Sequence, residues 1–324
     1  MSTAENAKLQ YEAGQNATAM SALTNSGDET TFTSGASLWS GTSGYAPVVR
    51  PNGLLTGGAV TVHADNDKVT VAALTCNLQG VVTSVAAGEA TITRPASDKA
   101  KVCSVTINSS GAIAVVAGTD GAGTTFSETR AAAGGPPLIP VDSIEIAQVR
   151  VTTSAAGAVA ASQIYQVVGS HCERADFPLW TVNYDEGSVT FLDALPEIHT
   201  GTVPKKVYAS YAEPIFADVA LASDFVPPET SHSVTSTQVY GTTLGATSST
   251  LGQGTFTAYL ENGVSDALVS LKNQNLWFKF FPDRYATPYL LCQGKLGISR
   301  TFPAGDTIQA ACTINAASAA VEVS

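Results

Sequence analysis

Short runs in which apolar and polar residues alternate recur along most of the chain. Between residues 46 and 117 they include AVTVHA, KVTVAAL, VVTSV, EATITR, KVCSVTI and AIAVVAG, and Gly, Pro or Asn-Asp bounds each run. Val, Thr and Ile with a period of two, between turn residues, are typical of half-buried strands. The pattern predicts a small antiparallel sandwich or barrel and leaves the order of its strands open.

A second group of alternating runs follows a connector at residues 118–140. The connector contains Gly-Gly-Pro-Pro, in which two prolines remove backbone donors and fix an extended path. The next runs are SIEIAQVRVTT, SQIYQVV, WTVNYD, SVTFLDAL and KKVYASYA. The stretch WTVNYDEGSVTFL predicts a hairpin that turns at Asp185, Glu186 and Gly187. We therefore expect residues 46–205 to form one β-rich domain.

The first 45 residues are polar and mixed. Leu9, Tyr11, Met20 and Leu23 are compatible with a short helix, although Gly14 argues against a long one. Residues 24–44 are typical of a loop, with an edge strand near residues 30–33. We expect residues 1–45 to form a flexible arm that orders against a neighbouring molecule. Whether this arm belongs to the C-terminal domain stays open.

Residues 206–324 show a different order of elements. After Pro227-Pro228, a Thr- and Ser-rich stretch at 231–252 predicts a protruding hairpin or loop. The strand GTFTAYL, a short helix near 264–272 and the strands NLWFKFFP, PYLLCQGKLGISRTF and TIQAACTINAAS follow. Ser265 is the expected N-cap, with Asp266 in the first turn. Leu268, Val269 and Leu271 would form the buried stripe of this helix.

Four aromatic residues cluster on one of these strands. On a strand Trp277 shares a face with Phe281, whereas Phe278 shares the opposite face with Phe280. We expect one face to pack against the helix and the other to lie in a contact between subunits, where aromatic residues are enriched. The candidates for packing and assembly are Leu268, Leu271, Trp277, Phe278, Phe280 and Phe281.

The composition favours self-assembly. Charged residues make up 13% of the chain, about half the usual fraction of a globular domain. A chain so poor in charge is expected to bury much of its surface against copies of itself, although a secreted β-rich domain can share this composition. The net charge of −11 argues against a direct grip on nucleic-acid phosphates.

The cysteines and the N-terminus bear on location. The five cysteines show no metal-ligand spacing, and we expect buried, reduced thiols: Cys76, Cys103, Cys172, Cys292 and Cys312. The N-terminus lacks the pattern of a signal peptide, and no apolar run approaches the about 18 residues of a membrane span. We expect a protein made in a cytoplasm, with no membrane partner.

Motifs of catalysis or metal binding are absent from the sequence. The four histidines (His63, His171, His199 and His232) are scattered, and His171 and Cys172 would point to opposite faces of a strand. No Gly-x-Ser-x-Gly stands on a strand-to-helix turn, and no glycine-rich loop carries the lysine of a phosphate site. Asp65-Asn66-Asp67 is typical of a hairpin turn. We expect no enzyme, no cofactor and no metal site.

The C-terminal segment resembles the major tail tube protein of long-tailed, non-contractile bacteriophages. The likeness is an order of elements: GTFTAYL, the helix at 266–272, the aromatic strand at 276–281, the Gly-punctuated strand at 293–299, the turn FPAGD at 302–306 and a last strand at 307–315. In that family the turn before the last strand commonly carries a Gly-Asp junction, here Gly305-Asp306.

This resemblance implies a fold and a role. The fold would be mainly β, a tail-tube-type sandwich or barrel at 206–324 with one short helix, plus an additional antiparallel β domain at 46–205 on the tube exterior. Six subunits would form a ring, and stacked rings would form a hollow conduit for genome delivery. DNA would pass the lumen without specific binding. Other tail proteins would be partners, and the protein, made in the host bacterial cytoplasm, would reside in the virion tail.

Two alternatives remain open at this point. One is another β-rich virion component, such as a tail terminator, a baseplate protein or a capsid decoration protein. Such a protein would stop at one ring or trimer instead of polymerising. The other is a carbohydrate- or surface-binding β-sandwich module, which would expose an aromatic platform in a groove. The stretch at 231–252 is the candidate hairpin between subunits.

Overall fold

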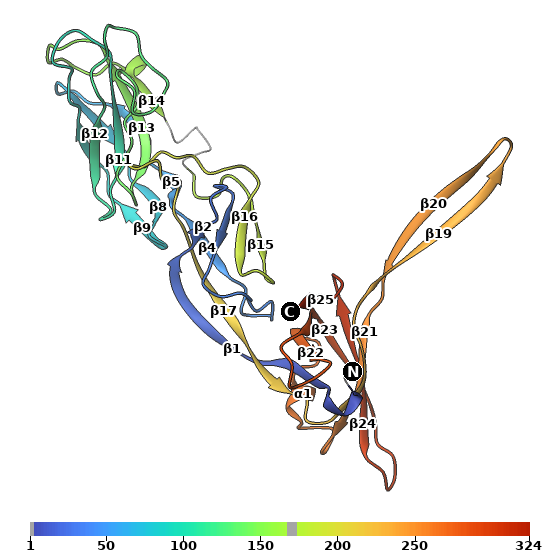
Figure 1. The fold of residues 1–324 in the computed structure, drawn as a ribbon. Helices are drawn as coiled ribbons and strands as arrows, with labels where there is room; N and C mark the ends of the chain where they lie inside the picture. Colours follow the sequence, from blue (N-terminus) through green and yellow to red (C-terminus); the bar gives the residue numbers. More distant parts are fainter. Residues whose placement is uncertain (1–2, 167–173) are drawn as a thin grey trace. The chain divides into compact units, whose positions relative to one another are not determined.

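A computed structural model describes residues 3–166 and 174–324 of the chain, and antiparallel strands dominate it (Figure 1). Over these residues the only α-helix is α1 (Ala267–Ser270), and two short 3-10 turns accompany it, η1 (Ala4–Asn6) and η2 (Ala161–Gln163). The prediction of a mainly β fold with one short helix and several antiparallel sheets is therefore confirmed.

The chain divides into two compact units. Unit 1 consists of Met1–Thr18, Leu38–Ala46 and Tyr211–Ser324. Unit 2 consists of Ala19–Ser37 and Pro47–Ser210. The chain thus passes between the units four times. The predicted boundary at 205/206 lies five residues from the one at Ser210, and the predicted arm at 1–45 is shared between both units.

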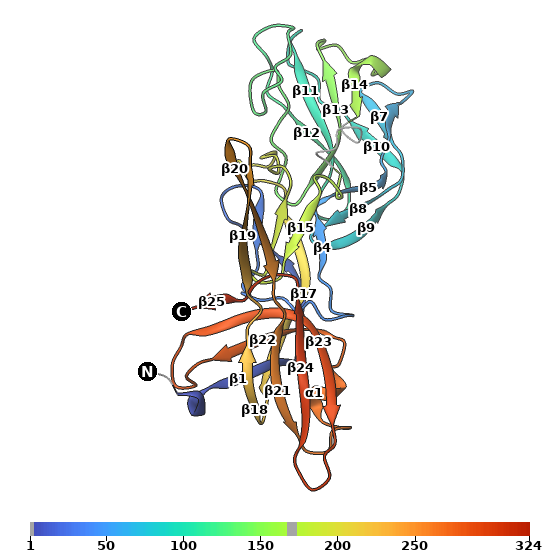
Figure 2. The ribbon, with the colours of Figure 1, turned by 90° about the vertical axis from the view of Figure 1, so that its right-hand side faces the viewer.

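Unit 1 is built on one long antiparallel sheet in the order β18-β21-β24-β23-β22-β1-β17, with β25 beside β23. The strands are β1 (Lys8–Ala22), β17 (Val207–Asp218), β18 (Ala222–Val226), β21 (Gly254–Leu260), β22 (Asn275–Phe281), β23 (Tyr289–Thr301), β24 (Ile308–Ala316) and β25 (Val321–Val323). Figure 2 shows β21, β24 and β23 side by side. Strands β1 and β17 each have one end in unit 2.

The prediction of a helix or flexible arm near the N-terminus is wrong. Residues 8–22 form strand β1, and its first part pairs with β22, with Leu9 opposite Phe280 and Tyr11 opposite Phe278. Leu9 and Tyr11 are both buried. Their spacing of two residues places them on one face of a strand, and the gain from burying that face outweighs the polar composition around them.

Helix α1 is shorter than expected and begins elsewhere. The expected span was 266–272, and the observed helix is Ala267–Ser270 with Asp266 at the N-cap in place of Ser265. The Asp266 carboxylate accepts backbone hydrogen bonds from Glu261 (2.8 Å) and Gly263 (2.7 Å). Asp266 thus closes the loop before the helix, which explains why the cap lies one residue later.

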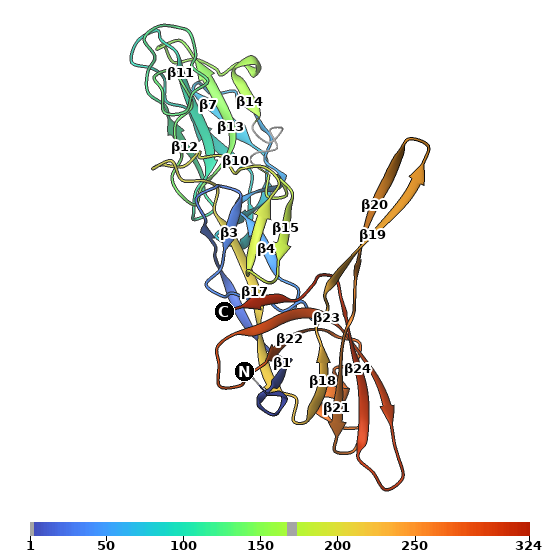
Figure 3. The same cartoon turned by 45° about the vertical axis from the view of Figure 1, so that its right-hand side comes forward.

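The Thr- and Ser-rich stretch forms a two-stranded hairpin within unit 1. Strands β19 (Thr230–Val239) and β20 (Thr242–Leu251) pair in one unbroken register over ten residue pairs. The hairpin extends away from β18, β21 and β24 (Figures 1 and 3). The predicted protruding hairpin is therefore present.

The described residues of unit 2 form four small antiparallel sheets. Their orders are β10-β7-β6, β12-β11-β13-β14, β15-β16-β3-β2 and β5-β8-β9, and β4 pairs with the start of β17. The strands are β2 (Thr24–Asn25), β3 (Thr31–Thr33), β4 (Val48–Pro51), β5 (Gly53–Gly57), β6 (Val60–Val62), β7 (Lys68–Val71), β8 (Leu74–Leu78), β9 (Val81–Val85), β10 (Gly88–Thr91), β11 (Lys101–Ile107), β12 (Ile113–Ala117), β13 (Ile144–Val151), β14 (Ile164–Gln166), β15 (Trp180–Asn183) and β16 (Ser188–Phe191).

The core of unit 2 and one of its turns follow the sequence pattern. Alternating Val, Ile and Leu side chains of β5–β13 form one buried cluster. The predicted hairpin at Asp185, Glu186 and Gly187 connects β15 and β16, and Gly187 has the positive φ of 59° that such a turn favours.

Candidate assembly surface

Three of the six predicted packing residues are buried in unit 1, namely Leu268, Trp277 and Phe278. Leu268 and Phe278 belong to the same buried cluster, together with Leu276 and Leu296. Leu271, in contrast, is only half-buried at the border of this cluster. The helix therefore contributes mainly Leu268 to the core, because it is one turn long and presents a single buried position.

Strand β22 divides its aromatic residues between two faces. Phe278 is fully buried in the core, whereas Trp277 is buried on the other face, where its indole Nε1 donates to the Trp39 carbonyl (2.8 Å). Phe281 is half-buried, with Lys8 Nζ 4.4 Å from its ring centroid. Trp277 is thus committed within its own chain and does not offer a free surface.

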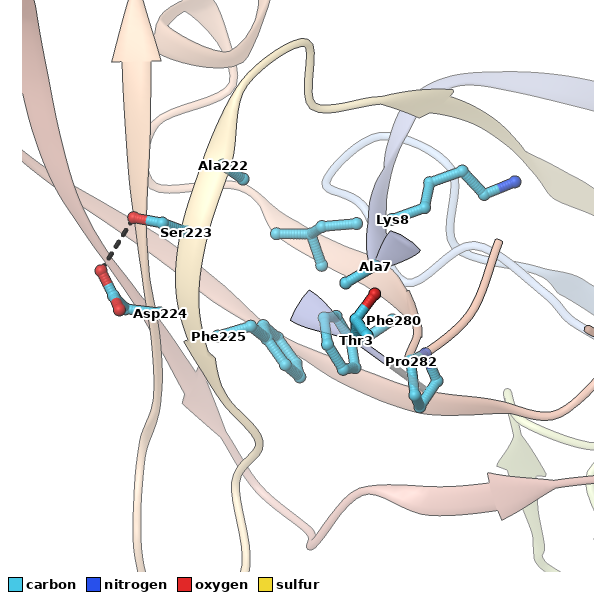
Figure 4. Close-up of a pocket in the computed structure, with 10 residues that line it drawn as sticks. Thr3, Ala7, Lys8, Ala222, Ser223, Asp224, Phe225, Phe280 and Pro282 are labelled. Atoms are coloured by element: carbon cyan, nitrogen blue, oxygen red, sulfur yellow. Dashed lines mark hydrogen bonds between the residues drawn. The ribbon is translucent and has the colours of Figure 1, made fainter. Parts of the chain in front are cut away.

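Phe280 continues the core to the surface of unit 1. Its ring stacks on that of Phe225, with centroids 4.4 Å apart and planes at 18°. A pocket opens beside this pair, and Figure 4 shows both rings at one side of it with Pro282 close by. Thr3 and Leu9 also line the pocket. It is a surface hollow with two aromatic rings in its wall and with charged groups at Lys8 and Asp224.

The same pocket adjoins the end of the sheet. Strand β18 is the terminal strand and pairs only with β21 among the strands that the structure describes. Its register is interrupted between Ser223 and Val226, and Asp224 there has a positive φ of 56°. The edge strand is thus short and bulged, which is a common protection against pairing with another strand.

A buried carboxylate holds three segments of unit 1 together. Glu12 is fully buried and accepts hydrogen bonds from the hydroxyls of Ser40 and Thr42 and from the Trp277 backbone N–H (3.1 Å). Gln15 donates a further bond of 2.8 Å. The sequence pattern does not indicate this cluster, because Glu12 stands in a polar run and its partners other than Gln15 are 28 or more residues away.

The β19–β20 hairpin has a surface unlike the rest of unit 1. Every residue from 230 to 250 whose burial the structure describes is exposed, including Val234 and the tip residue Tyr240. Residues 230–251 contain no Asp, Glu, Lys or Arg. Hydroxyl contacts such as Ser233 to Ser248 (2.7 Å) connect the strands. The hairpin is an exposed, charge-free double strand with two open edges.

Three titratable side chains of unit 2, those of His199, His63 and Asp67, each contact a neighbouring group. His199 in unit 2 is buried, its Nε2 lies 2.9 Å from the Ser143 carbonyl, and burial lowers its pKa. His63 lies at the surface beside Glu89 (3.1 Å). Asp67, in the predicted hairpin turn between β6 and β7, pairs with Arg94 (2.7 Å). The pair His171 and Cys172 lies outside the described residues.

The cysteines that the structure describes are buried and free. They are Cys76, Cys103, Cys292 and Cys312. Burial raises the pKa of Cys292 and Cys312 to about 12 and that of Cys76 to about 11. These thiols therefore stay protonated near neutral pH, and a protonated thiol is a poor nucleophile.

Comparisons with known proteins add no family. No protein-family model matches this sequence, and a search of the curated proteins finds no relative of significant similarity.

In residues 3–166 and 174–324, no three His, Cys, Asp or Glu side chains lie together as metal ligands would. No helix in this described part has the length and hydropathy of a membrane-spanning helix.

Proposed function

We propose that this chain is a structural subunit of a bacteriophage tail tube, in which hexameric rings stack into a hollow conduit for genome delivery. On this proposal the protein turns over no substrate and needs no cofactor. Unit 1 would build the tube wall, and unit 2 would decorate its exterior. Other tail proteins would be partners, and DNA would pass the lumen without specific binding.

The observation that carries the proposal is the β19–β20 hairpin. A two-stranded hairpin without a packed face is marginally stable by itself in water. Open strand edges are normally protected by charge, proline or a bulge. This hairpin has none of these over ten pairs, and its exposed apolar residues include Val234 and Tyr240. A partner surface would explain the missing packed face, the unprotected edges and the exposed apolar residues.

The order of elements in unit 1 supports the tube in particular. The strand β21, helix α1 and the strands β22, β23 and β24 follow one another as in the tail tube fold that the sequence resembles. The chain's low content of charged residues agrees with a subunit that is largely covered by its neighbours.

The test is negative-stain microscopy and sedimentation of the purified full chain at increasing concentration. We expect hollow tubes of stacked rings. Closed single rings or trimers would favour a tail terminator, baseplate or decoration protein, and protein that stays monomeric at every concentration would contradict assembly altogether.

A matched pair of variants tests the role of the hairpin. Val234 and Val264 are exposed to a similar degree, 75% and 71%, but only Val234 lies on the hairpin. We expect Val234→Lys to prevent tube formation, because a lysine on an edge strand blocks pairing. Val264→Lys should assemble like the wild type. If both variants assemble equally well, the hairpin does not join subunits.

A further inference from the structure

We propose that Tyr240, at the tip of the β19–β20 hairpin, inserts into the pocket beside Phe225 and Phe280 of a second copy of the chain. This inference rests on the proposed function, because it names the surface that receives the hairpin in the assembled tube.

Tyr240 has the character of an anchor residue. It is fully exposed at the turn between β19 and β20, and the strands that carry it are free of charge. Tyrosine is enriched among the residues that dominate binding energy, since it buries a large ring and retains one hydroxyl for a hydrogen bond. A solvent-exposed ring at a hairpin tip gains this energy only when it meets a partner.

The pocket has the matching chemistry. Phe225, Phe280 and Leu9 supply apolar walls, and Figure 4 shows Thr3 close to Phe280. A tyrosine ring packs against such aromatic faces in an offset or edge-on arrangement. The Thr3 hydroxyl and the open backbone edge of β18 provide hydrogen-bond partners for the phenol.

The bulged edge of β18 favours a side-chain anchor over an added strand. A strand that joins a sheet needs a regular row of backbone donors and acceptors, and the interruption between Ser223 and Val226 breaks this row. The aromatic pair just beside the edge remains open. The contact with this pocket is therefore made by the tip of the hairpin, while the flanks of β19 and β20 stay open for pairing with other copies of the chain.

The length of the hairpin assigns the pocket to another molecule. Ten residues per strand reach about 33 Å at about 3.3 Å per residue, and the hairpin extends away from the sheet that holds the pocket (Figure 3). Tyr240 therefore points away from the pocket of its own chain. Lys8 and Asp224 also line the pocket, and they carry opposite charges. The Tyr240 side chain is uncharged, so neither of them repels it.

The experiment places the photo-crosslinking residue p-benzoylphenylalanine at position 240 of the full chain. Assembled protein is irradiated, and mass spectrometry identifies the linked peptides. We expect links between chains to peptides that contain Phe225 or Phe280. The matched control carries the same residue at position 45, because Tyr45 is an exposed tyrosine of unit 1 outside the hairpin.

Substitutions give a second readout. Tyr240→Ala should raise the protein concentration needed for assembly by about tenfold or more, as expected for an aromatic anchor, whereas Tyr45→Ala should not. Ala222 is exposed and lines the pocket, so Ala222→Trp should fill it and produce the same defect in a folded protein.

The outcomes separate the two proposals. Tubes whose position 240 links to any other surface, or tubes that form normally with Tyr240→Ala, would overturn the pocket assignment and leave the tube proposal intact. A wild-type chain that never assembles would overturn both. Links to the pocket together with the two substitution defects would establish the contact.

Discussion

The hairpins β23–β24 and β19–β20 belong to the same unit and differ in what supports them. Along β24, exposed and buried residues alternate, and Cys312 and Ile314 are in the core. Along β19–β20 the described residues from 230 to 250 are exposed on both faces, although the register is just as regular. The first hairpin packs against its own unit, whereas the second has no buried face among residues 230–250 that the structure describes.

The largest effect is expected at the core that β23–β24 helps to form. Leu268→Asp places an unpaired charge in this core, and we expect a loss of at least about 3 kcal/mol in the free energy of unfolding of unit 1 and no assembly. Chemical denaturation followed by circular dichroism measures it. Val264→Asp, at an exposed site just before α1, is the control and should change stability by less than about 0.5 kcal/mol. If Leu268→Asp still formed normal tubes, the placement of helix α1 against the core would be contradicted.

Removal of the second hairpin should separate folding from assembly. Thr230 pairs with Leu251, so residues 231–250 can be replaced by Asn-Gly, which closes a two-residue turn. We expect an unchanged melting temperature and no polymer in sedimentation. A large fall in melting temperature would mean that the β19–β20 hairpin, like β23–β24, stabilises its own chain.

A matched pair of mild substitutions compares the two hairpins directly. Ile314→Thr leaves a hydroxyl and a gap in the core and should cost about 2 to 3 kcal/mol. Val234→Thr changes an exposed valine of β19 and should cost less than about 0.5 kcal/mol in the unassembled protein. Urea denaturation of both variants measures the difference. Equal costs would show that the two hairpins are equally supported.

His199 predicts a dependence of the free energy of unfolding on pH. Burial lowers the pKa of His199, so the folded protein binds fewer protons there than the unfolded chain, in which histidine titrates near 6.5. The contribution of the neutral His199 side chain to the free energy of unfolding is therefore complete above about pH 6.5. It is lost as the pH falls toward the lower folded pKa, with a slope of at most about 1.4 kcal/mol per pH unit.

Replacement of His199 by glutamine isolates this slope. His199→Gln should remove the dependence of unfolding free energy between about pH 6.5 and the folded pKa. An identical pH profile for wild type and His199→Gln would rule out His199 as its source.

Local pattern was sufficient to predict the strands but not their connections. GTFTAYL forms β21 with its predicted bounds, Gly254–Leu260, because strict alternation and flanking turns fix a strand locally. The sequence did not indicate that the chain alternates between the two units, since residues 19–37 do not differ in composition from the segments around them. The strand β1 was also missed, because its large apolar residues are few: Leu9 and Tyr11 stand near its start, and Met20 follows only after a polar, Ala- and Gly-containing stretch.

The sequence predicts one part of the candidate site, the hairpin, but not the other part, the pocket. The hairpin at 231–252 is a local feature, and its lack of charge is visible in the sequence. The pocket, in contrast, joins Leu9, Phe225 and Phe280, which come together only through the sheet order. Sequence spacing over more than 200 residues carries no signal of such a contact.

Hydrogen–deuterium exchange of the hairpin amides tests the central claim most directly. The measurement compares dilute, unassembled protein with the pelleted assembly, and β23–β24 serves as the internal reference. We predict fast exchange at the open edges of β19 and β20 in the free protein and strong protection in the assembly, with β23–β24 protected in both. Equal and fast exchange of β19–β20 in both states would contradict the claim that this hairpin joins copies of the chain.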